Sequence, residues 1–337
     1  MEISVFWWIF LQFMLNYRRK GRISGKKGLS RKGVTDMAFT IVRIIAFSFI
    51  LPVAWLCAAP LHPADTFKNR VVTLRKPTEK ELPAVSIHTL GTGAGTEPLP
   101  TRQYASCLFE VNGKLYLFDA GSGSCRTAHL SGIDITKIRT VFISHPHRDH
   151  VGGLPDFFWN IRKLVFMRDL ATPEITVFVP EMKMWDAVFA MTKLGGISRM
   201  AFEPRLIADG TIFDDGNVKV EARHNHHIQR TKADVYTSFS FRITAGKRKI
   251  VYSGDVKTYH DMGDWLDDCD LLMIETGHYK ASDICAGLRK DGAKVKEIMF
   301  VHSGREIIND CEGARGRAEK AWGKPVVIAE DGCTYVF

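Results

Sequence analysis

Three histidines and an aspartate stand within six positions of the stretch TVFISHPHRDHVGGLPD, residues 140–156, in a chain of 337 residues with 12 histidines. The run before them is apolar and rich in β-forming residues. We therefore expect a short buried strand at residues 140–144, with the polar cluster in the loop at its end. Neutral imidazole and carboxylate are ligand types that Zn²⁺ and related divalent ions take. The residue types and their position predict a metal site.

The spacing inside the cluster divides its side chains into two sets. In an extended segment, residues two apart point the same way, so His145 and His147 can share one ion. Asp149 and His150 then face a second position beside the first. A chance cluster in a solvated loop, which is the plain alternative, does not account for the buried strand that precedes these residues.

The HxHxDH pattern of these four residues resembles the signature of the metallo-β-lactamase superfamily of binuclear metallohydrolases. The resemblance implies an α/β fold, a four-layer αββα sandwich, for residues 83–337. The stretch HTLGTGAGTEPLPTRQYASCLFEVNGKLYLFDAGSG is similar to the opening of the ribonuclease Z-like, phosphodiesterase-like branch. In that branch the counterpart of Asp119 is a structural residue near the site, which forms hydrogen bonds to the ligand loop.

The resemblance also implies ligands farther along the chain. Two close dications repel each other, and a shared carboxylate offsets that repulsion. Asp255 in VYSGDV resembles the bridging aspartate of the family, and Gly254 would let the backbone approach the ions. His302 in MFVHSGRE resembles the last family histidine, which joins Asp149 and His150 on the second ion.

The third histidine of the first ion lies in VKVEARHNHHIQR. Strand alternation over residues 218–222 indicates that the chain leaves its sheet shortly afterwards. That argument leaves His224, His226 and His227 open. In the family an apolar residue precedes this ligand by seven positions, which matches Val220 and His227, so His227 is our choice.

Two further residues are candidates for substrate chemistry. In MIETGHYKAS, Glu275 and His278 are similar to a Glu and His pair that flanks the site in the same branch. This chain separates them by only three positions, so a proton-donor role and a structural role for His278 both stay open. Arg305 follows His302 by three positions and could bind a phosphate oxygen. The alternative for Arg305 is an exposed residue at the start of a helix.

The ligand set implies two divalent ions, with Zn²⁺ as the first choice and Mn²⁺ or Fe as alternatives. Such a pair generates hydroxide at neutral pH, which Asp149 and Asp255 would orient. We expect a metal-dependent hydrolase that acts on phosphodiesters. The alternatives are a ribonuclease Z-like tRNA 3′-processing endonuclease, a lactone, carboxyl-ester or sulfate-ester hydrolase, and a non-catalytic binding module on the same fold. The predicted metal ligands are His145, His147, Asp149, His150, His227, Asp255 and His302.

Charge favours a small-molecule partner over nucleic acid. Residues 1–36 contribute +6 of the formal net charge of +9, which leaves +3 for the remainder of the chain. That excess is too small to hold a long polyanion at physiological salt. His227 and Asp255 are 28 positions apart, an interval with no room for the long tRNA-binding arm that ribonuclease Z enzymes insert there.

The basic N-terminal region, residues 1–59, carries apolar segments typical of export. The apolar run of residues 44–59 follows Arg43 and ends in small residues, which predicts a signal peptide or a membrane anchor. Met37 is then the alternative start. We expect an exported, periplasmic or secreted, or a membrane-anchored catalytic domain, after a linker at residues 60–82. Export would permit disulfides among the seven cysteines, but their spacing specifies no pairing.

From Pro83 onward, short β-rich runs alternate with helical stretches. Four of the apolar runs lead into Asp119, His145, Asp255 and His302. Such strand ends would place these side chains along one cleft. The predicted strands are residues 85–90, 106–111, 114–118, 140–144, 175–179, 218–222, 238–243, 249–252, 271–274, 297–301 and 326–329, and the predicted helices include residues 154–167, 181–194, 281–290 and 315–322.

Overall fold

The computed structural model of the chain describes residues 70–74, 85–95, 97–194, 200–229 and 235–337. All of them belong to one of two compact units, Phe67–Phe337. The predicted signal or anchor, the alternative start at Met37 and residues 60–69 and 75–82 of the predicted linker lie outside the described residues. No helix within the described ranges has the length and hydropathy needed to cross a membrane.

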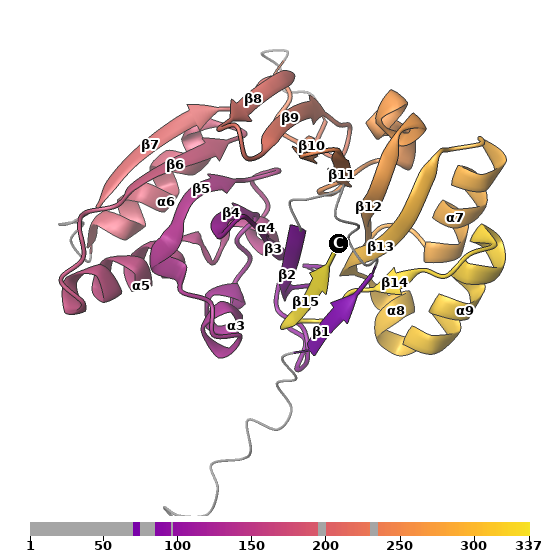
Figure 1. Cartoon of the computed structure of the whole chain (residues 1–337), viewed down its shortest axis with the longest axis horizontal. Coiled ribbons are helices and arrows are strands. Elements are labelled where there is room, and N and C mark those ends of the chain that lie inside the picture. Colours follow the sequence, from indigo (N-terminus) through magenta and orange to yellow (C-terminus); the bar gives the residue numbers. More distant parts are fainter. Residues whose placement is uncertain (1–69, 75–84, 96, 195–199, 230–234) are drawn as a thin grey trace, which may run out of the picture. The chain divides into compact units, whose positions relative to one another are not determined.

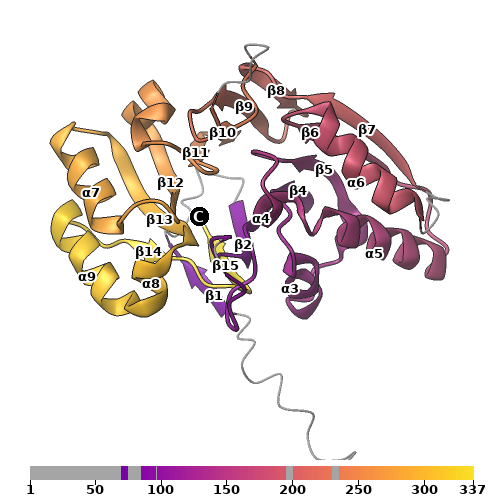
Figure 2. The same cartoon turned by 180° about the vertical axis from the view of Figure 1, so that it is seen from behind.

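The first sheet has eight described strands and is mixed (Figures 1 and 2). Strands β15, β2, β3 and β4 pair antiparallel, whereas β4, β5, β6 and β7 run parallel. In sheet order the strands are β1 (Arg70–Thr73), β15 (Cys333–Val336), β2 (Val85–Gly91), β3 (Ser106–Val111), β4 (Lys114–Phe118), β5 (Ile138–Phe142), β6 (Glu174–Val179) and β7 (Ala201–Leu206).

The second sheet has seven described strands. Strands β8 to β11 pair antiparallel, and β11 to β14 run parallel. In sheet order they are β14 (Val327–Ile328), β13 (Val295–Ser303), β12 (Cys269–Thr276), β11 (Arg248–Tyr252), β10 (Phe239–Ala245), β9 (Lys219–His224) and β8 (Gly210–Asp214). The interior strand β12, CDLLMIET, is buried at every position, as expected where both faces of a sheet are covered.

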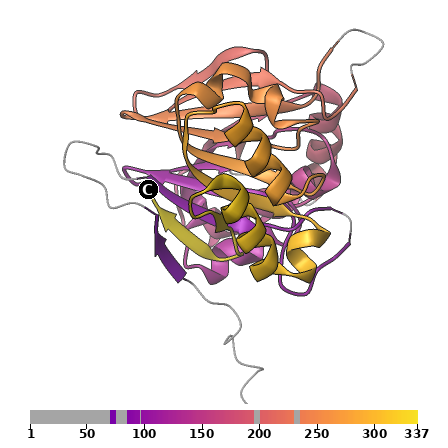
Figure 3. The same ribbon diagram turned by 90° about the vertical axis from the view of Figure 1, so that its right-hand side faces the viewer.

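Helices cover the outer face of each sheet. Helix α5 (Leu154–Met167) buries the face that carries Phe157, Ile161 and Val165, a helical spacing, against the first sheet. The second sheet is covered in the same way (Figures 1 and 3). Other helices on the first sheet include α3 (Ser124–Leu130), η3 (Ile135–Lys137) and α6 (Met182–Leu194), and those on the second include η4 (Tyr259–Asp267), α7 (Ala281–Lys290) and α9 (Cys311–Trp322).

The two sheets pack face to face over a shared apolar core. Phe118, Phe142 and Phe178 stack along the first sheet, with ring centroids 4.6 and 4.8 Å apart, and Phe241 of the second sheet meets Phe118 edge-on at 5.5 Å. The layers are therefore helix, sheet, sheet and helix. This confirms the predicted αββα sandwich.

Most predicted elements agree with the structure, and α5 and α7 have the predicted bounds. Strands β7, β8 and β15 are not among the predicted strands. The first two are exposed or half-buried at most positions and show no apolar alternation. Strand β1 lies within the predicted linker, where RVVT pairs with β15 as an edge strand that is exposed at three of its four positions. The predicted boundary at residue 83 stays a prediction.

Candidate metal centre

The predicted ligands follow strands of both sheets and meet between them. His145 follows β5, and His147 precedes the short helix α4 (Arg148–Val151), which carries two more of the predicted ligands. His227 follows β9, Asp255 follows β11, and His302 is the second-to-last residue of strand β13. Loops at strand ends can change without disturbing the sheets, so this edge is suited to a site.

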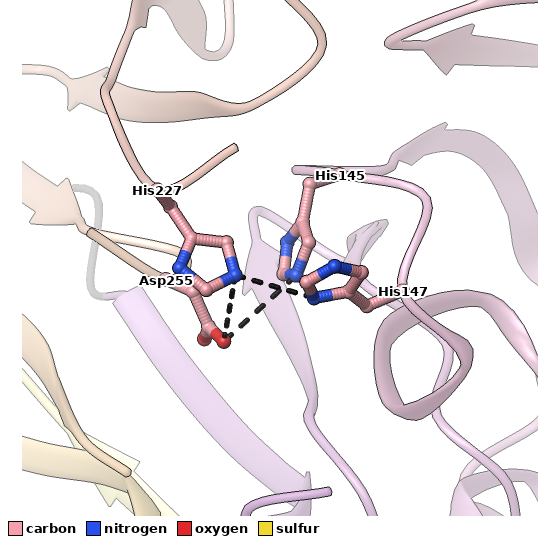
Figure 4. A group of neighbouring side chains, drawn as sticks. All are labelled: His145, His147, His227 and Asp255. Atoms are coloured by element: carbon pink, nitrogen blue, oxygen red, sulfur yellow. Dashed lines mark hydrogen bonds and ion pairs between the residues drawn. The ribbon is translucent and has the colours of Figure 1, made fainter. Parts of the chain in front are cut away.

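Figure 4 shows the first group, which consists of His145, His147, His227 and Asp255. One ligand-type atom from each residue lies within 4.8 Å of all the others. His227 Nε2 is 3.2 Å from His147 Nδ1 and 3.7 Å from Asp255 Oδ2. His145 Nε2 is 3.8 Å from the same Asp255 oxygen. Three imidazoles and one carboxylate oxygen thus converge on one point.

The second group consists of Asp149, His150, Asp255 and His302, with ligand-type atoms again within 4.8 Å of one another. His302 Nε2 is 3.1 Å from Asp149 Oδ2, and His150 Nε2 is 3.6 Å from it. Asp255 Oδ1 is 3.2 Å from His150 Nε2 and 3.4 Å from His302 Nε2. Asp255 therefore presents Oδ2 to the first group and Oδ1 to the second, as a bridging ligand would.

His227 is the histidine of the open set that reaches the centre. The imidazole of His224 instead binds Asp209 at 2.6 Å and stacks on Tyr236, and His226 binds Asp261 at 2.7 Å. The buried side chain of Asn225 supports this arrangement, because its Oδ1 accepts a hydrogen bond from His227 N at 3.1 Å.

The buried carboxylate of Asp119 orients the loop that carries His145 to His150. Its Oδ1 accepts a hydrogen bond from Ser144 N at 2.7 Å. Its Oδ2 accepts from Ser144 Oγ and Tyr252 Oη and lies 2.8 Å from His150 Nδ1. A carboxylate on the second nitrogen of a histidine fixes the ring, so that the first nitrogen is available to a metal. The structural role implied for Asp119 agrees with these contacts.

Backbone geometry brings these groups close together. Asp119 and His302 adopt φ values of 56° and 49°, a left-handed conformation that is uncommon for residues other than glycine and is found at functional sites. Gly254 has φ 57°, and a Cβ there would lie 2.9 Å from that of Ser144. A Cβ on Gly95 would lie 2.3 Å from Asp149 Oδ2. The glycine beside Asp255 thus lets its loop approach the ligand loop, as expected.

Burial lowers the pKa of His145 well below its usual value, and the charge of neighbouring His150 lowers it further. Burial also lowers the pKa of His227. Both imidazoles are therefore neutral at neutral pH, which is the protonation state that binds a metal ion.

The pKa values of Asp255, Asp149 and His150 shift so that each of these groups favours its charged form. Burial alone would raise the pKa of Asp255, but His302 and His150 hold it well below its usual range. Burial would lower the pKa of His150, yet Asp255 and Asp119 raise it well above its usual value. The aspartates therefore remain ionised in the buried centre, and Asp149 follows the same pattern through its hydrogen bond with His302.

The residues present fit divalent metal ions. Among the described residues, His145 Nε2, His150 Nε2 and Asp255 Oδ1 are buried and have no hydrogen bond, although they approach oppositely charged groups. Buried polar atoms left in this state are costly unless something binds them. Nitrogen and oxygen donors without a thiolate suit Zn²⁺, Mn²⁺ or Fe. The centre is thus suited to divalent metal ions.

Glu275 and His278 lie beside the two ligand groups. The Glu275 carboxylate is fully buried and contacts His278 Nδ1 at 2.9 Å, His278 N at 3.0 Å and Val256 N at 3.1 Å. This carboxylate raises the pKa of His278. The His278 side chain is 44% exposed, and its Nδ1 is 4.0 Å from Asp255 Oδ2. Despite the short spacing, His278 therefore lies beside the two ligand groups, with its side chain partly exposed to solvent.

Arg305 begins the short helix α8 (Arg305–Asn309), directly after the strand that carries His302. It is exposed and makes no hydrogen bond or ion pair within the described part of the chain. Its guanidinium is thus available to a ligand, and its role in substrate binding stays a prediction.

Three residues that support the centre were not found from the sequence, namely Asn225, Tyr252 and Asp261. Tyr252 ends β11 and reads locally as a core aromatic, although its hydroxyl binds Asp119. Asn225 and Asp261 lie in polar stretches, and their partners are known only from the fold. No local signal distinguishes these residues from ordinary core and turn residues.

The αββα sandwich and the two ligand groups define the class: this is a metallo-β-lactamase fold protein. The family follows from a direct match. The model of the anti-Pycsar protein Apyc1 family matches residues 85–289, more than half of the chain, and the chain belongs to this family.

Curated relatives extend the similarity to ribonuclease Z. The ribonuclease Z of Pyrococcus abyssi is 44% identical over 71 residues, which cover 21% of this chain and 23% of that protein. The ribonuclease Z of Picrophilus torridus is 28% identical over 224 residues, or 56% of this chain and 72% of that protein. The chain thus spans under a quarter of the length of the first of these relatives.

A solved structure agrees on the fold. The metallo-β-lactamase fold protein YhfI of Bacillus subtilis superposes with a TM-score of 0.59 at 18% identity, over 76% of this chain and 100% of that chain. At this identity the likeness concerns the fold alone.

The geometry predicts unequal effects for two neighbouring histidines. His227→Ala should lower the metal content from about two ions per chain to about one, because it removes an imidazole of the first group. His224→Ala is the matched control and should keep both ions, because His224 contacts Asp209 and Tyr236 instead. Elemental analysis after dialysis against Zn²⁺ measures both. Loss of an ion only in His224→Ala would contradict the assignment of His227.

Proposed function

We propose that the protein is a metal-dependent phosphodiester hydrolase with two divalent ions, Zn²⁺ in the first instance. The position of Asp255 carries this proposal. Its two oxygens face different ligand groups, 3.7 Å from His227 Nε2 and 3.2 Å from His150 Nε2. Two adjacent dications suit a phosphoryl centre, which carries negative charge in both the ground state and the transition state. The ribonuclease Z relatives support the same reaction class.

The chain's own groups have separate tasks in this reaction. Bound divalent ions at such a centre would lower the pKa of water toward about 7 and stabilise developing negative charge. Asp149 and Asp255 would orient the attacking water. Glu275 would hold His278 by Nδ1 and leave its Nε2 to give a proton to the leaving oxygen. Arg305 would bind a phosphate oxygen that does not react.

We assign small phosphodiesters as the substrate, because little of the chain is available to hold a long nucleic acid. The 28 positions between His227 and Asp255 include the described strands β10 and β11. The modest net charge outside residues 1–36 points the same way. The main alternative is pre-tRNA cleavage, which the names of the curated relatives favour. Hydrolysis of lactones, carboxyl esters or sulfate esters and a purely binding role remain the other candidates.

The substrate proposal predicts an order of kcat/KM. On one metal-loaded preparation of residues 60–337, a bis-aryl phosphate should be hydrolysed faster than a β-lactam, an aryl lactone, an aryl sulfate or a pre-tRNA. Arg305→Ala should raise KM for the phosphodiester about tenfold, the value of one charge-assisted contact of about 1.4 kcal/mol. Arg315→Ala, in α9 and paired with Glu312, is the control. Preferred cleavage of pre-tRNA or of a lactone would refute the assignment.

The proton-donor proposal predicts a dependence on the leaving group. His278→Ala should lower kcat about 10²-fold for an alkyl leaving group, which needs a proton, and far less for a p-nitrophenyl leaving group, which does not. Metal content should be unchanged. An equal loss for both leaving groups would indicate that His278 has a structural role only.

We propose further that residues 44–59 take the catalytic domain out of the cytoplasm, as a signal peptide or as an anchor. The basis is the apolar run after the basic residues 18–32. A reporter that is active only outside the cytoplasm, fused after Pro63, should be active. Arg substitutions at Phe47 and Ile50 should abolish that activity, and activity of only a cytoplasmic reporter would refute the proposal.

A further inference from the structure

Asp261, in the first turn of η4, joins two loops that carry different predicted ligands. Its side chain is only 5% exposed. Asp261 Oδ1 is 2.7 Å from His226 Nδ1, and Oδ2 accepts from His226 N at 3.3 Å. The same Oδ2 accepts from Lys257 N at 3.0 Å. One carboxylate thus binds the residue before His227 and the residue two after Asp255.

These contacts exceed what a local cap needs. Thr258 and Asp261 form a capping box, in which the carboxylate accepts from Thr258 N at 3.4 Å. A cap of this kind requires only that bond. The contacts to His226 reach 35 positions back along the chain. Together with the bond from Lys257 N, these contacts join the loop that follows β9 to the loop that follows β11.

Besides this carboxylate, Arg223 of β9 contacts η4 through Met262 O and Asp264. His227 is held from the interior by Asn225, and Val256 is held by Glu275. Neither Asn225 nor Glu275 contacts the other loop through a hydrogen bond within the described residues. Asp261 binds both loops, and so influences the separation of His227 Nε2 and Asp255 Oδ2, which is 3.7 Å.

We propose that Asp261 is a positioning residue that sets the metal affinity of the first group by fixing the loops of His227 and Asp255 against each other. The inference rests on the proposed metal centre. Residues outside the ligand set that orient ligands commonly change metal affinity 10- to 100-fold. The effect should be larger on the first group, since the second group contains only Asp255 from these two loops.

Zinc titration of the full metal-free chain against a chromophoric chelator tests this. Asp261→Ala should raise the dissociation constant of one of the two ions by about 10- to 100-fold and leave the other within about threefold. Asp261→Asn keeps one oxygen that can accept from Lys257 N and His226 N, and should lose less affinity. Asp264→Ala is the matched control, because this aspartate lies in the same segment, is 72% exposed and pairs with Arg223 of β9.

The melting temperature of the metal-free chain separates positioning from a purely structural role. A structural role would lower that temperature in Asp261→Ala and leave both zinc affinities at the wild-type value, which would overturn the inference. An equal loss of affinity in Asp264→Ala would overturn it too. Should Asp261→Ala fail to fold, Asp261→Asn and Asp261→Ser are judged by the same criteria.

Failure of the proposed function can be distinguished from failure of this inference. A wild-type chain that binds two ions but hydrolyses no phosphodiester would refute the function and leave the role of Asp261 intact. A wild-type chain that binds no zinc would refute both.

Discussion

The geometry of the centre depends on the buried carboxylate of Asp255, which contacts imidazoles of both ligand groups. A buried carboxylate is costly unless charges and hydrogen bonds compensate it. Asp255 is 2% exposed and lies within 4.0 Å of imidazole nitrogens from five different histidines. Those histidines come from four separate segments of the chain. The backbone of each segment must therefore be correctly placed for its histidine to compensate the charge of the Asp255 carboxylate.

Three carboxylates outside the predicted ligand set hold the histidines and loops of the centre in place. Asp119 supports His150, Glu275 supports His278 and the loop after Asp255, and Asp261 connects that loop with the segment before His227. All three accept backbone hydrogen bonds as well as contacting imidazoles. They fix ring orientation and loop position together, which is what a centre of defined geometry requires.

A structural feature can be predicted from the sequence when the residues that determine it are close together along the chain. The HxHxDH cluster is contiguous and follows a strong strand pattern, so its residues and its position were both predictable. His227 differs from His224 and His226 only in where the chain turns after β9, so family spacing was needed to select it. Asp261 and Asn225 act through partners that only the fold brings near. Strands β7 and β8 lack apolar alternation because they lie at sheet edges with much of their surface exposed.

The same arrangement links the centre to the stability of the fold. Among the described residues, imidazole and carboxylate atoms of the centre are buried without hydrogen bonds, and Asp119 and His302 hold left-handed backbone conformations. Each such feature costs on the order of 1–3 kcal/mol. The two sheets and their aromatic core supply the stability that maintains this geometry. A ligand that binds only the folded chain then stabilises it in proportion to the logarithm of ligand concentration over Kd. The loops that Asp255 brings together are therefore the part of the fold that an ion bound at the centre would stabilise most directly.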